Sequence, residues 1–345
     1  MLRYLKIFLI WLYFQLIGLW KILEENIWDR HRNVIVSPNP EAQIKTIVIT
    51  GGNRGIGFEA VLKLLQLKYH LIVACRRPSE AHDLIREGLS RSPNSTEETT
   101  RKLGTYECIQ LNVASMKSVK QFASELIKRG CDINILINNA GVMFGPYELT
   151  EDGLESQMAT NYFGHFLLTN LLLPVLKTSA ENSQTNSRVI NVASCAHFAG
   201  SWFDLNDLNA NKYYSAYQTY SNSKAAQILF TKYLSKKLYT EECNTVDINC
   251  IHPGVVNTGL FKHVGWARWF SCLPLLFFKT AKQGGDSIVY AATSLDIEGK
   301  GGLYIDNSRL ARSSAFVNNI ANQDTLWRKT CELLEKISEE YSVKL

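Results

Sequence analysis

The chain has 345 residues, a length that allows one large α/β domain or two small ones. Its hydrophobic fraction of 46% is enough for a sizeable core and too high for a disordered protein. Its net charge of +5 comes from 37 basic and 32 acidic residues, without the dense basic blocks of a nucleic-acid-binding arm. We therefore expect a globular protein that does not bind nucleic acid.

The N-terminal segment is strongly apolar. Between Ile7 and Trp20, Gln15 is the only polar residue. A membrane span needs about 20 apolar residues, and the run reaches that length only when it is extended to Leu2–Leu23. A secretory signal peptide is the competing interpretation, but no small-residue cleavage site follows. We therefore predict an uncleaved membrane anchor or interfacial helix over residues 1–30.

Residues 31–43 contain Pro38 and Pro40 and are typical of a short linker. We expect this linker to separate the anchor, which lies outside the fold, from a domain over residues 44–320 with a C-terminal helix over residues 321–345. Basic residues stand on both sides of the apolar run, so the positive-inside rule favours neither orientation.

Strand-like apolar runs alternate with helix-like segments along the rest of the chain. They lie at Ile44–Ile49, His70–Cys75, Thr105–Leu111, Ile133–Asn138, Arg188–Ser194 and Val246–His252. This alternation predicts a single α/β domain with a doubly wound parallel sheet.

The eight cysteines contain neither a Cys-x-x-Cys pair nor the spacing of a metal site. They lie at positions 75, 108, 131, 195, 243, 250, 272 and 331. Several fall in apolar runs, so we expect reduced, mostly buried thiols and no bound metal.

Residues 50–57, directly after the first strand, read Thr-Gly-Gly-Asn-Arg-Gly-Ile-Gly and lead into a segment with helical apolar spacing. Gly51 permits a tight turn, Gly55 lets the backbone approach a phosphate, and Gly57 lets the helix pack closely on the strand. The N–H groups at the start of the helix then point at the anion. The sequence therefore predicts a Rossmann-type dinucleotide site. Its loop also contains Thr50, Asn53, Arg54 and Ile56.

The second strand is followed by Arg76, at a place where an NAD-specific site usually has an acidic residue for the ribose 2′-hydroxyl. Arg76 and Arg54 together can bind a 2′-phosphate and stack on adenine. We therefore expect NADP(H) as the preferred cofactor and NAD(H) as the alternative. A solvated surface charge is the competing interpretation of each arginine.

Three residues further along suit the interconversion of an alcohol and a carbonyl. Ser194 closes the fifth predicted strand, and Tyr220 and Lys224 are four positions apart, so they lie on one face of a helix. The pKa of a free tyrosine is about 10, and we expect the ammonium and a cofactor charge to lower it until Tyr220 can act as acid and base. Ser194 would bind the substrate oxygen. Taken alone, the Tyr-x-x-x-Lys pattern also arises by chance.

Further motifs complete the series. In chain order the whole set is the glycine loop at 50–57, Asn138-Asn139-Ala140-Gly141, Asn161, Ser194, Tyr220, Lys224 and Pro253-Gly254-Val255-Val256-Asn257-Thr258. In this combination and order, the chain resembles the short-chain dehydrogenase/reductase family over about residues 44–305.

The resemblance implies that Asn161, Ser194, Tyr220 and Lys224 are the catalytic residues, with Asn161 supporting the lysine through a water molecule in a proton relay. Tyr220 and Lys224 also belong to the implied cofactor site.

The rest of the implied cofactor site consists of two loops and the single residue Asn112, which differs from the family's usual residue at that place. Asn139, Ala140 and Gly141 line the adenine and ribose, and the loop with Pro253, Gly254, Val256 and Thr258 meets the nicotinamide amide. Asn112 stands where the family has an aspartate that contacts the adenine amino group, and its amide oxygen can still accept a hydrogen bond from that amine.

Finer likeness points to the retinol-dehydrogenase-like branch of this family. It rests on Asn161–Thr169, the long interval between Ser194 and Tyr220, and Ala74-Cys75-Arg76. The segments Pro253–Val264 and Leu326–Cys331 are most similar to the polyprenol dehydrogenases of that branch. The resemblance also implies a substrate flap over about residues 257–280, where tryptophans and phenylalanines are frequent.

We therefore expect a membrane-associated oxidoreductase, at the endoplasmic reticulum or lipid droplets, that interconverts a lipophilic alcohol and its aldehyde or ketone. A polyprenoid or retinoid is the expected substrate, and membrane lipid is an expected partner. A steroid substrate is one alternative, and a non-catalytic, membrane-tethered nucleotide-binding scaffold is the other. The sequence leaves the formation of a homo-oligomer open.

Overall fold

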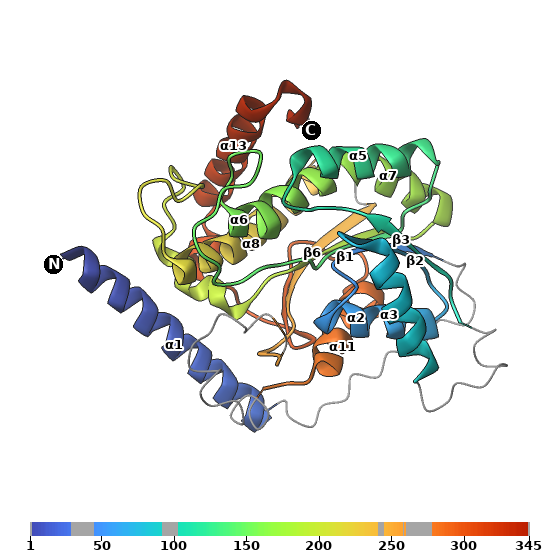
Figure 1. The fold of residues 1–345 in the computed structure, drawn as a ribbon, viewed down its shortest axis with the longest axis horizontal. Helices are drawn as coiled ribbons and strands as arrows, with labels where there is room; N and C mark the ends of the chain where they lie inside the picture. The colour runs from blue at the N-terminus through green and yellow to red at the C-terminus, as the bar shows by residue number, and fades with distance from the viewer. Residues whose placement is uncertain are drawn as a thin grey trace.

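The computed structural model describes residues 2–28, 45–91, 103–240, 245–257, 259 and 278–343. Its centre is a twisted sheet with helices on both faces (Figure 1). The predicted linker over residues 31–43 lies outside the described residues.

The sheet has eight strands in the order β3-β2-β1-β4-β5-β6-β7-β8. The strands are β1 Thr46–Thr50, β2 His70–Cys75, β3 Tyr106–Gln110, β4 Ile135–Asn138, β5 Ser187–Val192, β6 Val246–His252, β7 Tyr304–Asp306 and β8 Arg309–Leu310. All neighbours pair in parallel except β7 and β8, which are antiparallel. The predicted doubly wound parallel sheet is confirmed, but the sequence interpretation missed β7 and β8, which are too short to show a pattern.

Helices connect the strands and cover both faces of the sheet. The α-helices of the domain are α2 Gly55–Gln66, α3 Pro78–Ser90, α5 Met116–Lys128, α6 Ser156–Met158, α7 Gly164–Ser183, α8 Ala216–Thr240, α11 Ala281–Thr293, α12 Ala315–Asn318 and α13 Ile320–Ile337. Short turns of other helix types are η1 Ala159–Phe163, η2 Cys195–Trp202, η4 Leu295–Ile297 and η5 Glu339–Tyr341.

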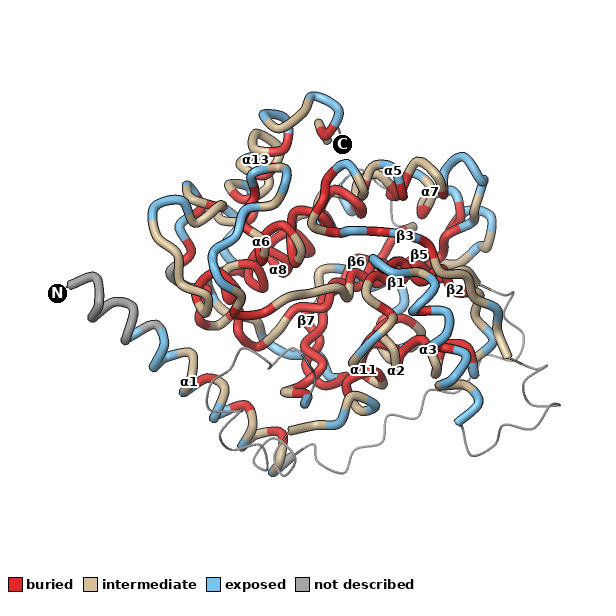
Figure 2. The backbone as a smooth tube through the Cα atoms, viewed as in Figure 1, coloured by how far each residue is buried: buried red, intermediate tan, exposed pale blue. Residues whose placement is uncertain are grey.

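The alternation of side chains along the strands builds two apolar cores, one on each face of the sheet. In β1, Ile47 and Ile49 belong to the core that includes residues of α2 and α11, whereas Val48 belongs to the core that includes residues of α5, α7 and α8. The central strands are therefore buried on both sides (Figure 2). This explains their continuous runs of β-branched residues.

The strand order reverses between β1 and β4, since β1 leads outward to β2 and β3 whereas β4 leads to β5 and β6. In open α/β sheets ligands bind beside such a switch point, at the carboxyl ends of the strands. The glycine loop after β1 and the Asn139–Gly141 segment after β4 flank this point. The fold thus brings two of the predicted cofactor segments together.

The N-terminal segment forms the helix α1, Leu2–Trp28. Within the part of the chain that the structure describes, no helix is both long and apolar enough to cross a membrane. The expectation that the segment lies outside the fold needs correction, because the second half of α1 lies against the domain (Figure 1) and its Lys21 Nζ donates to Asp306 at 2.6 Å. Apolar periodicity in a sequence cannot reveal a contact between residues so far apart in the chain.

The cysteines that the structure describes are all free thiols. They are Cys75, Cys108, Cys131, Cys195, Cys250 and Cys331. This agrees with the expected reduced state, and burial raises the pKa of the Cys108 thiol to about 11 and that of Cys250 to about 12, which makes both poor nucleophiles.

Candidate active site

The glycine loop has the shape that a pyrophosphate needs. Gly51 and Gly55 have φ angles of +67° and +57°, in the left-handed region that favours glycine. A Cβ atom on Gly57 would lie 2.4 Å from Asn139 Nδ2 and 2.6 Å from the Gly51 carbonyl oxygen. The first turn of α2 has Arg54 as its N-cap, without a side-chain capping hydrogen bond. Its N–H groups are therefore available to an anion, and the residues present fit a bound dinucleotide phosphate.

Thr50 and Asn139 tie the glycine loop to the end of β4. Asn139 Nδ2 donates to the carbonyl oxygens of Thr50 at 2.8 Å and Gly51 at 3.0 Å. In return, Thr50 Oγ1 accepts the backbone N–H groups of Asn139 and Ala140, both at 2.9 Å. This reciprocal pairing fixes the two loops to each other before any cofactor binds.

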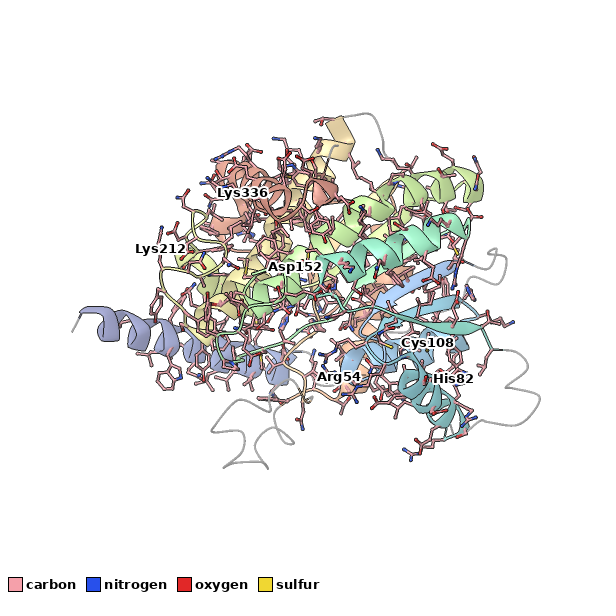
Figure 3. All side chains as sticks on the ribbon, turned by 45° about the horizontal axis from the view of Figure 1, so that its top comes forward. Arg54, His82, Cys108, Asp152, Lys212 and Lys336 are labelled. Atoms are coloured by element: carbon pink, nitrogen blue, oxygen red, sulfur yellow. The ribbon has the colours of Figure 1, made fainter. Side chains whose placement is uncertain are left out.

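The predicted adenine and ribose contacts lie on exposed side chains at the strand ends. Arg54 precedes α2 (Figure 3), Arg76 follows β2, and Asn112 follows β3, and all three are exposed. Asn112 Oδ1 accepts the N–H of Ala114 at 3.3 Å, so that oxygen already has one partner. Asn53 and Ile56 are half-buried in the glycine loop.

Asn161 lies in the π-helical turn η1 and is fully buried. Its Oδ1 accepts the N–H of Val142 at 2.9 Å, and its Nδ2 donates to the Val142 carbonyl oxygen at 3.0 Å and to Ser223 Oγ at 2.9 Å. A Cβ atom on Gly141 would lie 3.3 Å from Asn161 Oδ1 and 3.9 Å from Lys224 Nζ. Asn161, the β4 loop and Lys224 thus converge on Gly141.

Lys224, on α8, is buried with its amine close to Tyr220. Its Nζ donates to the Val192 carbonyl oxygen at 2.8 Å and to Gln227 Oε1 at 3.1 Å, and it lies 5.7 Å from the centroid of the Tyr220 ring. Burial lowers the pKa of the Lys224 amine to about 7. The amine is therefore divided between its charged and neutral forms near neutral pH.

Tyr220 and Ser194 form a hydroxyl pair at the end of β5. Ser194 is the N-cap of η2, and its Oγ accepts the N–H of Ala196 at 3.2 Å. Burial raises the pKa of Tyr220, and a hydrogen bond with Ser194 offsets this in part. The expected lowering of the Tyr220 pKa depends on a cofactor charge as well as on Lys224, so it stays a prediction for the cofactor-bound protein.

The loop after β6 reaches the same edge of the sheet. Pro253, Gly254 and Val256 are buried, and Gly254 has a φ of +93°. Val256 pairs with Lys279 in an isolated parallel bridge, which holds the loop against the segment before α11. Thr258 and nearly all of the predicted flap over residues 257–280 lie outside the described residues.

Aromatic side chains pack in one cluster with Tyr220. The Phe144 ring lies 5.3 Å from the Tyr220 ring and 4.4 Å from the Tyr217 ring, between centroids. Phe14 of α1 lies 5.3 Å from Phe144 and 5.4 Å from Tyr217. We call Phe14, Phe144, Tyr217 and the buried Met143 the aromatic wall. It makes the surroundings of the hydroxyl pair apolar.

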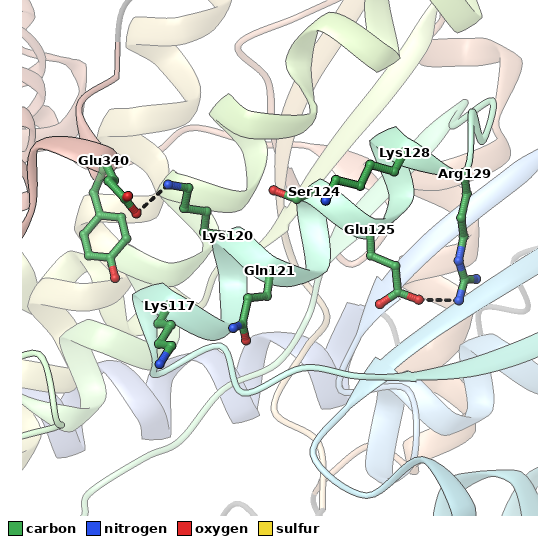
Figure 4. A pocket seen from close by; sticks show the side chains of 9 residues that line it. Lys117, Lys120, Gln121, Ser124, Glu125, Lys128, Arg129 and Glu340 are labelled. Atoms are coloured by element: carbon green, nitrogen blue, oxygen red, sulfur yellow. Dashed lines mark hydrogen bonds and ion pairs between the residues drawn. The ribbon is translucent and has the colours of Figure 1, made fainter.

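A separate hollow lies on the surface between α5 and η5 (Figure 4). It is lined mainly by charged side chains, among them Lys120, which forms a 2.6 Å ion pair with Glu340. None of the predicted site residues lines it, so we do not assign it to the active site.

Comparison with known families decides the relationship. The profile of the family described as "short chain dehydrogenase" matches residues 45–268. The chain belongs to this family. This short-chain dehydrogenase is an oxidoreductase that acts on CH–OH groups, as its relatives indicate.

Three curated relatives cover most of its length. It is 37% identical to "Short-chain dehydrogenase TIC 32 B, chloroplastic" of Brassica napus over 88% of this chain and 92% of that one. It is 36% identical to the human "Polyprenol dehydrogenase" over 87% of both chains. It is 39% identical to mouse "Retinol dehydrogenase 14" over 77% of this chain and 78% of that one. These relatives confirm the resemblance to the retinol-dehydrogenase-like branch.

Solved structures agree with the fold of this short-chain dehydrogenase. A protein from Mycobacterium paratuberculosis, described as putative and uncharacterized, matches with a TM-score of 0.64 at 30% identity, over 88% of this chain and 96% of that one. The "RhlG/NADP active-site complex" of Pseudomonas aeruginosa matches with a TM-score of 0.57 at 21% identity, over 79% and 97%, and shows the fold alone.

Sequence reasoning missed the part of α1 that reaches the site of this short-chain dehydrogenase. Phe14 joins the aromatic wall, and Lys21 and Glu25 are buried against the domain. The sequence held no signal for this contact, because charged residues on a helix are usually exposed.

Proposed function

We propose that this protein interconverts a lipophilic alcohol and its carbonyl compound, with NADP(H) as the preferred cofactor. The observation that carries the proposal is the aromatic wall beside the hydroxyl pair of Ser194 and Tyr220. An apolar wall with a few polar groups is typical of a small-molecule site, and here the polar groups are two hydroxyls that suit one substrate oxygen.

In the proposed reaction, both hydroxyls hydrogen-bond to the substrate oxygen. Tyr220 donates a proton to that oxygen when a carbonyl is reduced and accepts one when an alcohol is oxidised. A bound nicotinamide supplies the two-electron donor or acceptor. Ser194 orients the oxygen, because its own position is fixed as the N-cap of η2.

Lys224 and Asn161 would restore the proton of Tyr220. Lys224 lies on the same face of α8, one turn after the tyrosine, and its pKa of about 7 allows it to give and take a proton near neutral pH. Asn161 would extend the relay through a water molecule, since it approaches Lys224 beside Gly141.

The preference for NADP(H) is supported by charge. Arg54 and Arg76 are exposed at the two places that flank a ribose 2′-phosphate in this fold. Each guanidinium can form paired hydrogen bonds with a phosphate, whereas an acidic residue that would select the free 2′-hydroxyl of NAD is absent from the end of β2.

A polyprenoid or retinoid is the proposed substrate. The relatives named polyprenol dehydrogenase and retinol dehydrogenase support this class, and so does the aromatic wall. Large apolar side chains are also exposed along the outer face of α1, at Leu9, Trp11, Leu12, Tyr13, Leu16, Leu19, Trp20, Leu23 and Ile27. We propose that this outer face lies in the surface of the endoplasmic reticulum or a lipid droplet, where such a substrate dissolves.

The test is turnover by detergent-solubilised protein, followed by the absorbance of NADPH. The panel contains retinal, dolichal, polyprenol with NADP⁺, and a ketosteroid, and each is repeated with Tyr220→Phe. We expect turnover of a retinoid or polyprenoid that falls by about 10²–10⁴-fold in the variant, because the acid–base group is removed. Turnover of the steroid alone would replace the proposed substrate, and NADPH binding without turnover of any compound would favour a scaffold.

A further inference from the structure

The last turns of α1 insert charged side chains into the domain, next to the loop after β6. Lys21 and Glu25 are only 5% and 3% exposed. Burying a charge is costly unless it is paired and hydrogen-bonded. The two side chains therefore have a specific arrangement of partners.

Glu25 faces a group of donors. Its carboxylate accepts the backbone N–H of Val255 at 3.0 and 3.2 Å and Asn307 Nδ2 at 3.2 Å, and it lies 3.4 Å from His252 Nε2. The surrounding donors keep the pKa of Glu25 below its ordinary value although burial opposes this. Glu25 is therefore a carboxylate that accepts hydrogen bonds from Val255 and Asn307 and faces His252.

Lys21 balances the charge at the same place. Its Nζ donates to Asp306 at 2.6 Å and forms an ion pair with Glu24 at 2.7 Å. Glu25, His252 and Asp306 have ligand-type atoms within 4.8 Å of one another. We do not assign a metal to them, because the ammonium group of Lys21 and the N–H of Val255 already satisfy the two carboxylates.

The segment Pro253–Asn257 is held from two sides. On one side Lys279 donates its backbone N–H to the Val255 carbonyl oxygen and accepts the N–H of Asn257, both at 2.9 Å. On the other side Glu25 accepts the N–H of Val255. At Gly254 a Cβ atom would lie 2.7 Å from Asn307 Oδ1 and 3.3 Å from Glu25 Oε2, so the loop approaches α1 closely.

We propose that Glu25 of α1 is a positioning residue for the cofactor: by holding Val255 it fixes the loop that meets the nicotinamide. The proposal rests on the proposed function, from which the role of the loop is taken. The N-terminal helix is then a part of the active site as well as its contact with the membrane. Fixing the loop before binding removes an ordering cost that the cofactor would otherwise meet.

The direct test is Glu25→Gln, with Glu24→Gln as the matched control. The glutamine amide has one acceptor oxygen where the carboxylate has two. Its NH₂ group would therefore face N–H donors whose hydrogen bonds the Glu25 carboxylate now accepts. Loss of a charged hydrogen bond of this kind corresponds to about a tenfold change in a binding constant. We therefore expect the Kd and KM for NADPH to rise by about that factor while kcat changes little. Among the described residues Glu24 is paired with Lys21 and has no hydrogen bond to the loop, and its removal leaves Lys21 paired with Asp306. We therefore expect Glu24→Gln to bind NADPH like the unmodified protein.

The split between KM and kcat separates positioning from damage to the fold. A variant that is partly unfolded loses kcat at unchanged KM and melts earlier, whereas a misplaced loop raises KM and Kd. An unchanged NADPH Kd in folded Glu25→Gln would overturn the proposal, and so would an equal effect of Glu24→Gln.

Amide hydrogen exchange of the unmodified protein gives a second measurement, which needs no variant. We expect the N–H of Val255 to be protected before cofactor is added, because Glu25 accepts it. Exchange at the rate of an unstructured peptide would overturn the proposal. The NADPH Kd and the hydrogen exchange of Val255 are both measured without a lipid substrate, so these two readouts remain valid when the proposed substrate is wrong. Failure of the unmodified protein to bind any dinucleotide would instead refute the proposed function.

Discussion

At the scale of single residues, burial has opposite effects on the pKa values of Lys224 and Tyr220. It lowers that of the amine to about 7 and raises that of the phenol, so both groups favour their neutral forms. A neutral phenol is a proton donor. In the proposed reaction, a neutral Tyr220 would protonate a carbonyl oxygen without prior ionisation.

The two arginines near the predicted ribose site allow a sharp test of the cofactor preference. We expect Arg54→Ala combined with Arg76→Ala to raise the Kd for NADPH by about tenfold or more, because charged hydrogen bonds to the 2′-phosphate are lost. The Kd for NADH should change little, since NADH lacks that phosphate. Fluorescence titration of both cofactors measures the difference.

Arg77→Ala is the matched control for this pair. Arg77 is the next residue and is also exposed, but its guanidinium donates to Glu80 at 2.9 Å. We expect its removal to leave both cofactor affinities unchanged. Equal losses for NADH and NADPH in the double variant would contradict the assignment of the arginines to the 2′-phosphate.

At the scale of elements, the contact between α2 and the loop after β4 makes Gly57 sensitive to substitution. In Gly57→Ala the new methyl group would collide with Asn139 Nδ2 and the Gly51 carbonyl oxygen, both of which belong to the predicted cofactor site. We expect the free energy of unfolding to fall by about 1–3 kcal/mol, the usual cost of overpacking, and the affinity for NADPH to fall as well. Thermal unfolding and cofactor titration measure the two effects.

Gly18→Ala provides the control for this substitution. Gly18 is also helical, and a Cβ atom there would have no neighbour within 4 Å. Alanine favours a helix over glycine by up to about 1 kcal/mol, so we expect a slight gain in stability. If Gly57→Ala also gained stability and kept its NADPH affinity, the close approach of α2 to Asn139 would not be required for either property.

The elements that the sequence predicted well are those with many residues in one pattern. The central strands stand out because both of their faces are buried, as in β1 with Ile47, Val48 and Ile49. The edge strand β3 is only partly buried. The glycine loop could be predicted for a similar reason, because its backbone angles restrict which residues fit. The strand β8, with only Arg309 and Leu310, carries too few residues for any periodicity.

At the scale of the whole molecule, the contribution of α1 could not be predicted. Its composition indicates an apolar helix, but the partner of Glu25 is the backbone of Val255, and a backbone N–H has no signature in the sequence. The same holds for Phe14, which contacts Phe144 only once the fold brings them together. The predicted motifs thus cover the cofactor side of the predicted site, whereas the aromatic wall depends on tertiary packing.

The two faces of α1 imply how the whole molecule meets a lipid surface. The inner face contacts the domain through Phe14, Lys21 and Glu25, and the outer face exposes a stripe that includes Leu16, Leu19 and Leu23, each more than half exposed. Because both faces belong to one helix, insertion of the outer face into a membrane would hold the aromatic wall next to the lipid phase.

We therefore predict that replacing these three leucines by serine lowers the affinity of the full chain for phospholipid vesicles by at least about tenfold, since each removes apolar area from the contact. The matched control replaces Leu295, Leu310 and Ile320 by serine. These three residues are at least as exposed but lie outside α1, so we expect their replacement to leave binding unchanged. Vesicle flotation measures both variants, and NADPH binding shows that each is folded. Equal binding by the two variants would mean that another surface meets the lipid. Loss of binding confined to the α1 variant would support contact of α1 with the membrane, and the active site would then lie close to the lipid because α1 also contributes Phe14 to the aromatic wall.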